Sequence, residues 1–156
     1  MAVGLVVGLA AVSLVAAWAA LCFSDLGGLL CVRPPLFVKE SSYRAVLEEI
    51  GAGRITTGPE GTAPLPGRYT GLTPRDEVFI DRRPGGVVLV LFPVWYGRGG
   101  DLQGYLHASR PLADADYYTV DWGPGGVHQH LTVAGVEFLS AEPVRPPWYW
   151  VWRRVD

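Results

Sequence analysis

The chain has 156 residues and a formal net charge of −2 at pH 7, and 49% of its residues are hydrophobic. A chain of this length has room for one domain of ordinary size. Its single lysine is Lys39, so no basic tract is present. The composition therefore does not suggest a nucleic-acid-binding protein.

The N-terminal part of the chain is apolar. Residues 1–24 contain no Asp, Glu, Lys, Arg or His, and residues 2–23 ("AVGLVVGLAAVSLVAAWAALCF") are almost entirely apolar. As a helix, residues 2–23 would be about 33 Å long, which matches the bilayer hydrocarbon core of about 30 Å. We therefore expect a transmembrane helix at 1–24 in a single-pass membrane protein. The small residues Gly4 and Gly8 permit close packing of such a helix against another.

Two other interpretations of this segment stay open, a cleavable signal peptide and a buried core helix. A signal peptide normally has a basic start and a shorter apolar stretch.

The sequence also leaves open on which side of the membrane the domain lies. Arg33, Lys39 and Arg44 follow the expected span, so the positive-inside rule alone places the domain in the cytoplasm. Both cysteines precede residue 32, so no disulfide framework in the domain reports on the compartment.

Residues 25–40 are predicted to form an interfacial linker. Pro34 and Pro35 cannot continue a helix. We expect the apolar residues that follow to lie near the membrane or against the domain, and these are Leu36, Phe37 and Val38.

A short amphipathic helix is predicted next, in the segment "SSYRAVLEEIGAG". Ser41 or Ser42 is a suitable N-cap, and Gly51 can end the helix. The apolar residues with helical spacing are Tyr43, Val46, Leu47 and Ile50. This helix is expected to open a soluble domain at 41–156.

The sequence after this helix predicts a compact antiparallel β-sheet. The expected fold class is therefore α+β, mainly β. The segment "EVFIDR" (77–82), the turn "RPGG" (83–86) and the apolar run at 87–96 form a hairpin signature. Pro93 suggests a bulge or an edge position. Further strands are expected at 102–108, 116–122, 127–133 and 136–140, and a last one at 148–155 after Pro146 and Pro147.

The loop "GRGGD" (97–101) raises the question of a ligand site. A Walker-type phosphate loop needs a lysine with a following hydroxyl and then a helix, and the segment "GRGGDLQGYL" contains none of these. A hairpin connection explains the loop, because Gly99 and Gly100 accept positive φ and Asp101 can cap the turn. Arg98 and Asp101 remain candidates for ligand contact.

His128 and His130 have metal-like spacing, because residues two apart in a strand face the same side. His107 or Asp121 is a possible third ligand. Two histidines without a fixed third ligand occur often on solvated strand faces, so no metal or cofactor is predicted.

The sequence shows no catalytic signature. The aspartates fall in loops or at strand ends, and no nucleophile motif is present in the expected domain. A small enzyme or a ligand- or metal-binding domain stays as the alternative function. It would use a face formed by Arg98, Asp101, His107, His128 and His130.

The tryptophan-rich tail "WYWVWRRV" offers an interaction surface. In a strand, Trp148, Trp150 and Trp152 share one face. We expect one face of this strand to close the core. The other, with Arg153 and Arg154, is a candidate to rest on lipid headgroups or on a partner.

The stretch "VLFPVWYGRGGDLQGYLHASRPL", with the preceding "YRAVLEEIGAGRI" and the late Trp-Tyr pair, resembles a family of small, uncharacterised bacterial single-pass membrane proteins. The specific part of the resemblance is 89–112. It implies a membrane-anchored β-rich domain outside the cytoplasm, against the arginine bias, and it carries no established activity, cofactor or catalytic residue.

Together these observations favour a membrane-anchored interaction or accessory module. Its expected partners are the lipid bilayer and a membrane protein or a larger membrane complex. No catalytic role is indicated by the sequence.

Overall fold

A computed structural model describes residues 35–121 and 127–153, without the side chains of residues 98, 120, 121, 127 and 128. The expected span at 1–24 with Gly4 and Gly8, the first ten residues of the expected linker, and Arg154 lie outside the described residues. Within the described ranges, no helix has both the length and the apolar character needed to cross a membrane.

The domain begins with one α-helix, α3, at Leu36–Gly51. Its end agrees with the prediction, but it starts earlier than expected. Pro35 precedes the first turn with extended backbone, and Ser41 and Ser42 are exposed within the helix, so neither is its N-cap. Burial of Leu36 against the domain explains the early start, because tertiary packing stabilises a first turn that has no side-chain cap.

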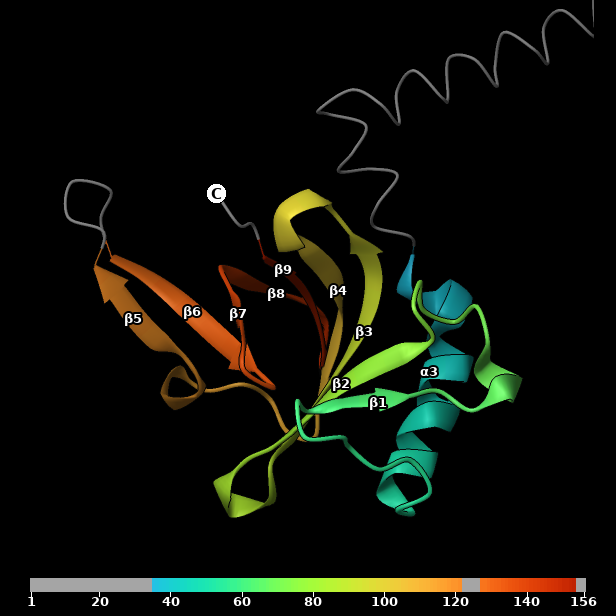
Figure 1. Cartoon of the computed structure of the whole chain (residues 1–156). Helices are drawn as coiled ribbons and strands as arrows, with labels where there is room; N and C mark the ends of the chain where they lie inside the picture. Colours follow the sequence, from blue (N-terminus) through green and yellow to red (C-terminus); the bar gives the residue numbers. More distant parts are fainter. Residues whose placement is uncertain (1–34, 122–126, 154–156) are drawn as a thin grey trace, which may run out of the picture. The chain divides into compact units, whose positions relative to one another are not determined.

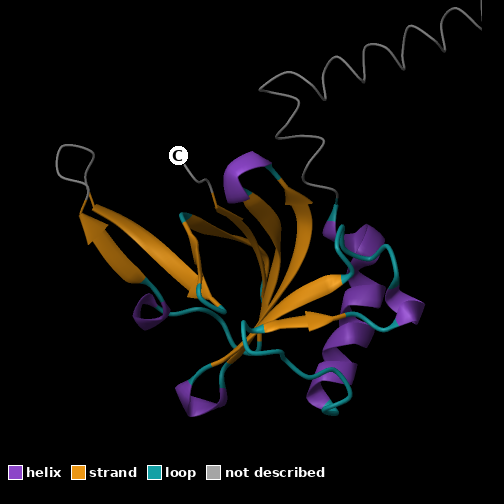
Figure 2. Cartoon of the chain, in the orientation of Figure 1, coloured by secondary structure: helices purple, strands orange, loops and turns teal. Residues whose placement is uncertain are grey.

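Six strands form one antiparallel sheet (Figures 1 and 2). In spatial order they are β1 (Thr62–Pro64), β2 (Glu77–Arg82), β3 (Val88–Tyr96), β4 (Leu102–Ala108), β9 (Trp148–Arg153) and β8 (Ser140–Arg145). The predicted hairpin, the following strand and the last strand are confirmed. No sequence pattern marks β1, which has only three residues, or β8, whose residues are mostly exposed and include Pro143.

A second sheet contains three antiparallel strands, β5 (Tyr118–Asp121), β6 (Val127–Val133) and β7 (Val136–Phe138). They correspond to the strands predicted at 116–122, 127–133 and 136–140. Short 3-10 turns connect elements of the domain at Gly67–Tyr69, Pro84–Gly86, Arg98–Gly100 and Asp114–Asp116.

The six-stranded sheet is covered on both faces, so the domain has three layers (Figure 1). One face packs against the three-stranded sheet. The buried residues of this interface are Phe79, Val87, Leu89, Leu91, Leu102, Leu106, Ala108, Tyr149 and Val151 from the six-stranded sheet side and Leu131, Val133 and Phe138 from the other. Alternation along each strand then directs the remaining side chains to the opposite face.

That opposite face packs against α3 through aromatic rings. The Tyr43 ring lies 4.4 Å from Phe92, 6.3 Å from Tyr105 and 5.9 Å from Trp148, measured between ring centroids. Tyr43 is 1% exposed. One helical side chain therefore contacts three neighbouring strands, β3, β4 and β9, and joins the helix to the sheet.

Pro93 lies at a bulge, which is one of the two positions that the sequence predicts for it. The pairing of β3 with β4 shifts between Pro93 and Trp95. β3 as a whole lies between β2 and β4, but its pairing with β2 covers only 88–91, so Pro93 also lies past the part of the strand that β2 pairs with. The bulge lets a residue without an N–H occupy a central strand.

Candidate functional site

The loop at 97–101 connects β3 to β4, as the sequence predicts. The Gly97 N–H donates to the Asp101 carbonyl at 2.9 Å. Gly99 and Gly100 have φ values of 75° and 103°, which favour glycine. The side chain of Arg98 lies outside the described part of the chain. The described backbone thus forms the bend that pairs two strands.

The structure does not bring the candidate ligand residues together. Asp101 precedes β4 and His107 is near its end, which separates them by about 20 Å along the strand. His130 belongs to β6 in the other sheet. The expected concave face with Asp101, His107 and His130 is therefore not formed.

His107 faces α3 and packs against the core. Its ring meets Trp148 edge-on, with the ring centroids 4.9 Å apart. Burial lowers the pKa of His107, and the nearby positive charge of Arg44 lowers it further. A neutral imidazole against an indole is a typical packing role for histidine, and it does not require a ligand.

His130 is buried and lies beside Glu137 of β7. The His130 Nδ1 is 2.5 Å from the Glu137 Oε1, and the ring of Tyr118 meets the His130 ring edge-on. Hydrogen bonds from Tyr118 and His130 hold the pKa of the Glu137 carboxyl below its ordinary value. No three His, Cys, Asp or Glu side chains among those described are grouped so that they could hold a metal ion. The side chain of His128 lies outside that set.

The tryptophans of β9 share one face, as predicted, but most of that strand is not a surface. Trp148 is 0% exposed and Trp150 is 5% exposed, and Tyr149 and Val151 on the other face are buried too. The expectation that one face of this strand is available to lipid or a partner is therefore wrong for these four residues. The reason is the three-layer fold, which covers both faces of β9. Trp152 and Arg153 stay half-buried.

Strand pairing places Trp152 in a row with two other half-buried side chains. Gln103 of β4 pairs with Trp95 of β3 on one side and with Trp152 of β9 on the other. At about 4.8 Å between strands, the two tryptophan backbones are about 10 Å apart. We call Trp95, Gln103 and Trp152 the tryptophan row. Trp95 belongs to the stretch at 89–112, but no sequence pattern places it near Trp152, so the row follows from the strand register.

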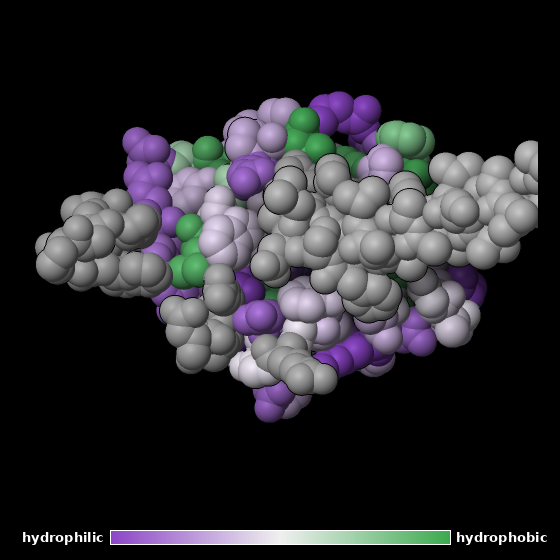
Figure 3. Space-filling view, turned by 90° about the horizontal axis from the view of Figure 1, so that it is seen from above, coloured by the Kyte–Doolittle hydropathy of each residue, from purple (hydrophilic) through white to green (hydrophobic). Residues whose placement is uncertain are grey.

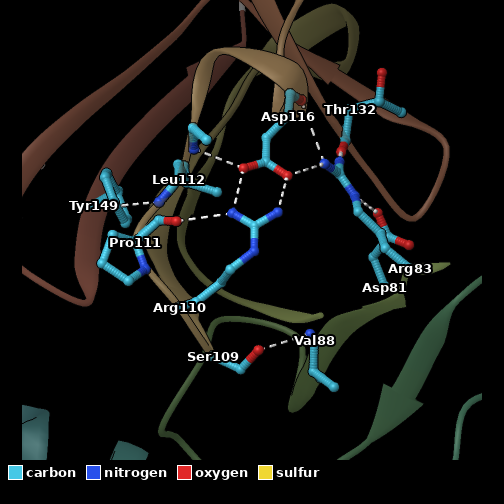
Figure 4. Close-up of polar contacts among 11 residues, drawn as sticks. Asp81, Arg83, Val88, Ser109, Arg110, Pro111, Leu112, Asp116, Thr132 and Tyr149 are labelled. Carbon is cyan, nitrogen blue, oxygen red and sulfur yellow. Dashed lines mark hydrogen bonds and ion pairs between the residues drawn. The ribbon is translucent and has the colours of Figure 1, made fainter. Parts of the chain in front are cut away.

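A second group of polar side chains lies where the chain passes from one sheet to the other (Figure 4). Its centre is the Asp116 carboxylate, which accepts hydrogen bonds from the Arg110 guanidinium at 2.7 and 2.9 Å and from the Ala113 N–H at 2.7 Å. Figure 4 shows this carboxylate between the guanidinium groups of Arg110 and Arg83. Only 6% of the Asp116 side chain is exposed.

Arg83 extends the group across both sheets. Its Nε donates to Asp81 of β2 at 3.1 Å, and its Nη2 donates to the carbonyl of Thr132 in β6. Its Nη1 also donates to the Asp116 carbonyl at 3.3 Å. We call Asp81, Arg83, Arg110 and Asp116 the sheet-bridging cluster. Its charges neutralise one another, so the geometry supports a structural role. The sequence places Asp116 in a loop or at a strand end, but no pattern in it indicates the two arginine partners.

Replacing Asp116 with asparagine should lower the free energy of unfolding by about 1.5–3 kcal/mol at pH 7, because charge-assisted hydrogen bonds are lost. Arg110 holds the pKa of the Asp116 carboxyl below its ordinary value, and Arg83 adds to this effect. A carboxyl whose pKa is lowered on folding stabilises the fold above its unfolded-state pKa and loses that effect as the pH falls through the folded-state pKa. The difference between wild type and Asp116→Asn should therefore shrink below about pH 4.

Urea unfolding of the full chain in mild detergent, followed by tryptophan fluorescence at several pH values, measures this difference. Asp114→Asn is the matched control, since Asp114 is an exposed aspartate of the same turn. It should change stability by less than about 0.5 kcal/mol. Equal effects of the two substitutions at pH 7 would contradict a stabilising role for the sheet-bridging cluster.

Comparisons of the chain with protein-family models, with curated proteins and with solved structures found no match. Support for a function therefore comes from the residues of this chain and their geometry. Two features have the clearest geometry. In the sheet-bridging cluster the charged groups are paired with one another, and in the tryptophan row the three side chains are half-buried.

Proposed function

We propose that the chain is a membrane-anchored interaction module that binds a membrane-protein partner through the tryptophan row. The apolar segment at 1–24 would serve as the single-pass anchor, with Gly4 and Gly8 available for helix packing. In this proposal the domain lies outside the cytoplasm, as the resemblance to small bacterial anchored proteins implies. It would act as an accessory subunit of a larger membrane complex.

The register across β3, β4 and β9 is the observation that carries the proposal. It places Trp95 and Trp152 on either side of Gln103, and all three are half-buried. On the same face, Phe92, Tyr105 and Trp150 are buried. The row therefore combines a rigid sheet backbone with partly exposed aromatic area.

Such a surface suits protein recognition. Tryptophan contributes large contact area with few rotatable bonds, and it is enriched among residues that dominate binding energy. The Gln103 amide between the two indoles can donate and accept hydrogen bonds at the centre of the contact. A partner with an apolar side chain and a polar backbone group at matching positions would satisfy all three residues.

Purification from native membranes with a C-terminal affinity tag tests the proposal. Gln103→Lys places a charge in the middle of the row without removing either indole, and Trp152→Ala removes one indole. We expect each to reduce a stoichiometric co-purifying protein by about tenfold or more, which corresponds to a hot-spot loss of about 1.4 kcal/mol or more.

Val144→Lys is the control, because Val144 is an exposed apolar residue of β8 outside the row. It should leave the co-purifying protein unchanged. A tagged wild-type protein that is recovered alone would contradict the proposal. So would a partner that is retained equally by Gln103→Lys and Val144→Lys, which would show that the row is not the contact.

A further inference from the structure

The start of α3 presents the most exposed large apolar side chains in the described part of the chain. Phe37 is 77% exposed and Val38 is 62% exposed, whereas the other exposed large hydrophobic residues, Tyr118 and Val144, are 38% and 37% exposed. Neighbouring Leu36 is 7% exposed and packs inward. Two consecutive apolar residues are therefore directed away from the domain at its first helical turn.

These two residues belong to an uncharged strip on the outward face of α3. With 3.6 residues per turn, the buried residues Leu36, Tyr43, Val46 and Ile50 define the inward face. The strip on the opposite side begins at the N-terminal end of the helix and contains Phe37, Val38, Ser41, Ser42 and Ala45. None of these five side chains is ionisable, and the exposed residues Arg44 and Glu48 follow on the same side of the helix, about two and three turns beyond Phe37.

The nearby charges do not cover the strip. The Lys39 ammonium donates to the carbonyl oxygens of Leu72 at 2.8 Å and Gly71 at 3.4 Å. Arg44 is paired with Glu40 at 2.7 Å. Both cations are therefore held by partners within the domain, and the apolar side chains at the first turn stay exposed.

The far end of α3 has the opposite character. Glu48 is exposed, and Glu49 is paired with Arg54 at 2.6 Å and with Arg68 at 2.7 Å. Val38 and Glu48 are separated by about 15 Å along the helix axis. The first turn of α3 thus presents exposed apolar side chains, whereas its last turns present acidic ones.

The apolar N-terminal end of α3 follows the apolar segment at 1–24 closely in the chain. Figure 1 shows the start of α3 where the described chain begins. If the apolar segment ends at residue 24, the residues between it and Leu36 can span at most about 40 Å. On the part of the face in Figure 3 that grey atoms leave visible, green hydrophobic areas lie beside purple hydrophilic ones.

We propose that the first turn of α3 docks on the lipid bilayer, with Phe37 and Val38 entering the boundary between headgroups and acyl chains. This inference rests on the membrane anchor of the proposed function. Helices that lie at this boundary bury apolar side chains by about 5–10 Å while their polar parts stay in water. The uncharged strip fits that position, and the acidic end of α3 would point away from it. The contact gives the anchored domain a defined orientation.

Site-specific fluorescence in vesicles tests the docking. The full chain, with Cys22→Ala and Cys31→Ser, is labelled at Val38→Cys or at Glu48→Cys with an environment-sensitive fluorophore. It is then reconstituted in phosphatidylcholine and phosphatidylglycerol vesicles with nitroxide groups at a shallow acyl position. We expect quenching of the label at 38 to exceed that at 48 by about threefold or more, given their separation along the helix. Both positions are exposed, and near-ultraviolet circular dichroism verifies that each variant folds.

A third labelled variant separates this inference from the anchor. It keeps Cys22 and carries Cys31→Ser, so its label reports on the proposed span. Quenching at 22 with equal quenching at 38 and 48 would overturn the docking and leave the anchor in place. The absence of quenching at all three positions would overturn both. A blue-shifted label at 38 without lipid quenching would show that protein, and not lipid, covers this turn, and would also overturn the docking.

Discussion

Replacing Tyr43 with alanine should lower the free energy of unfolding by about 3–5 kcal/mol, the range for removing a fully buried aromatic side chain. Tyr43 is 1% exposed, and its ring contacts Phe92, Tyr105 and Trp148. The cavity would lie between α3 and the sheet, where the surrounding rings are too rigid to collapse fully. Because α3 carries the proposed lipid contact, its loosening should also weaken that contact.

Urea unfolding of the full chain in mild detergent measures this effect. Tyr118→Ala removes the same atoms from a half-exposed position in β5, where 38% of the residue is accessible, and serves as the control. We expect its cost to be about 1 kcal/mol, near the average for single substitutions. Equal losses for the two variants would mean that Tyr43 does not join the helix to the sheet.

Gly104→Ala should cost about 2–4 kcal/mol, because the added methyl group meets backbone that cannot move aside. A Cβ on Gly104 would lie 2.4 Å from the carbonyl oxygen of Phe92 and 3.1 Å from its carbonyl carbon. Gly104 pairs with Pro93 at the bulge of β3, in the middle of the six-stranded sheet. The expected relaxation is a separation of β3 and β4, which would also displace the tryptophan row.

Gly51→Ala is the control for this substitution. Gly51 ends α3, and a Cβ there meets no atom within 4 Å. Alanine in a helix is favoured over glycine by about 0.5–1 kcal/mol, so this variant should be as stable as wild type or slightly more so. Thermal unfolding followed by circular dichroism compares the two variants. A Gly104→Ala protein with wild-type stability would show that β3 and β4 tolerate a wider separation than the structure indicates.

The second prediction concerns the glycine-containing stretch at 97–104. Gly104 allows the close approach of β4 to the bulge. At Gly97, a Cβ would lie 2.1 Å from the Cη2 atom of the Trp95 indole, so only glycine fits beside that ring. Gly99 has the positive φ that the connection requires. The glycines of this stretch therefore have structural explanations.

The sequence predicts much of the fold because its signals are local. Alternation in the segment at 77–82, the turn that follows, and the glycines at 97–101 identify a hairpin and the next strand, and the structure confirms them. The helix at 36–51 was predicted from its apolar spacing, although its first five residues were assigned to a linker. The strands that no pattern marks are β1 and β8, which are short or mostly exposed.

The candidate site depended on tertiary structure. The alternative function requires Asp101, His107 and His130 to share one face, but Asp101 and His107 lie at opposite ends of one strand and His130 lies in the other sheet. The tail tryptophans were predicted to share a face, and they do, yet covering layers bury Trp148 and Trp150.

By itself, the sequence determined the apolar N-terminal segment, the mainly β character of the domain and the positions of most strands. These properties depend on composition and on periodicity within a few residues. Only the tertiary structure decided which aromatic side chains stay accessible, how Asp116 meets Arg83 and Arg110, and that Phe37 and Val38 are exposed while Leu36 is not. Strand order and layer packing set these contacts between distant residues, and no local pattern encodes them.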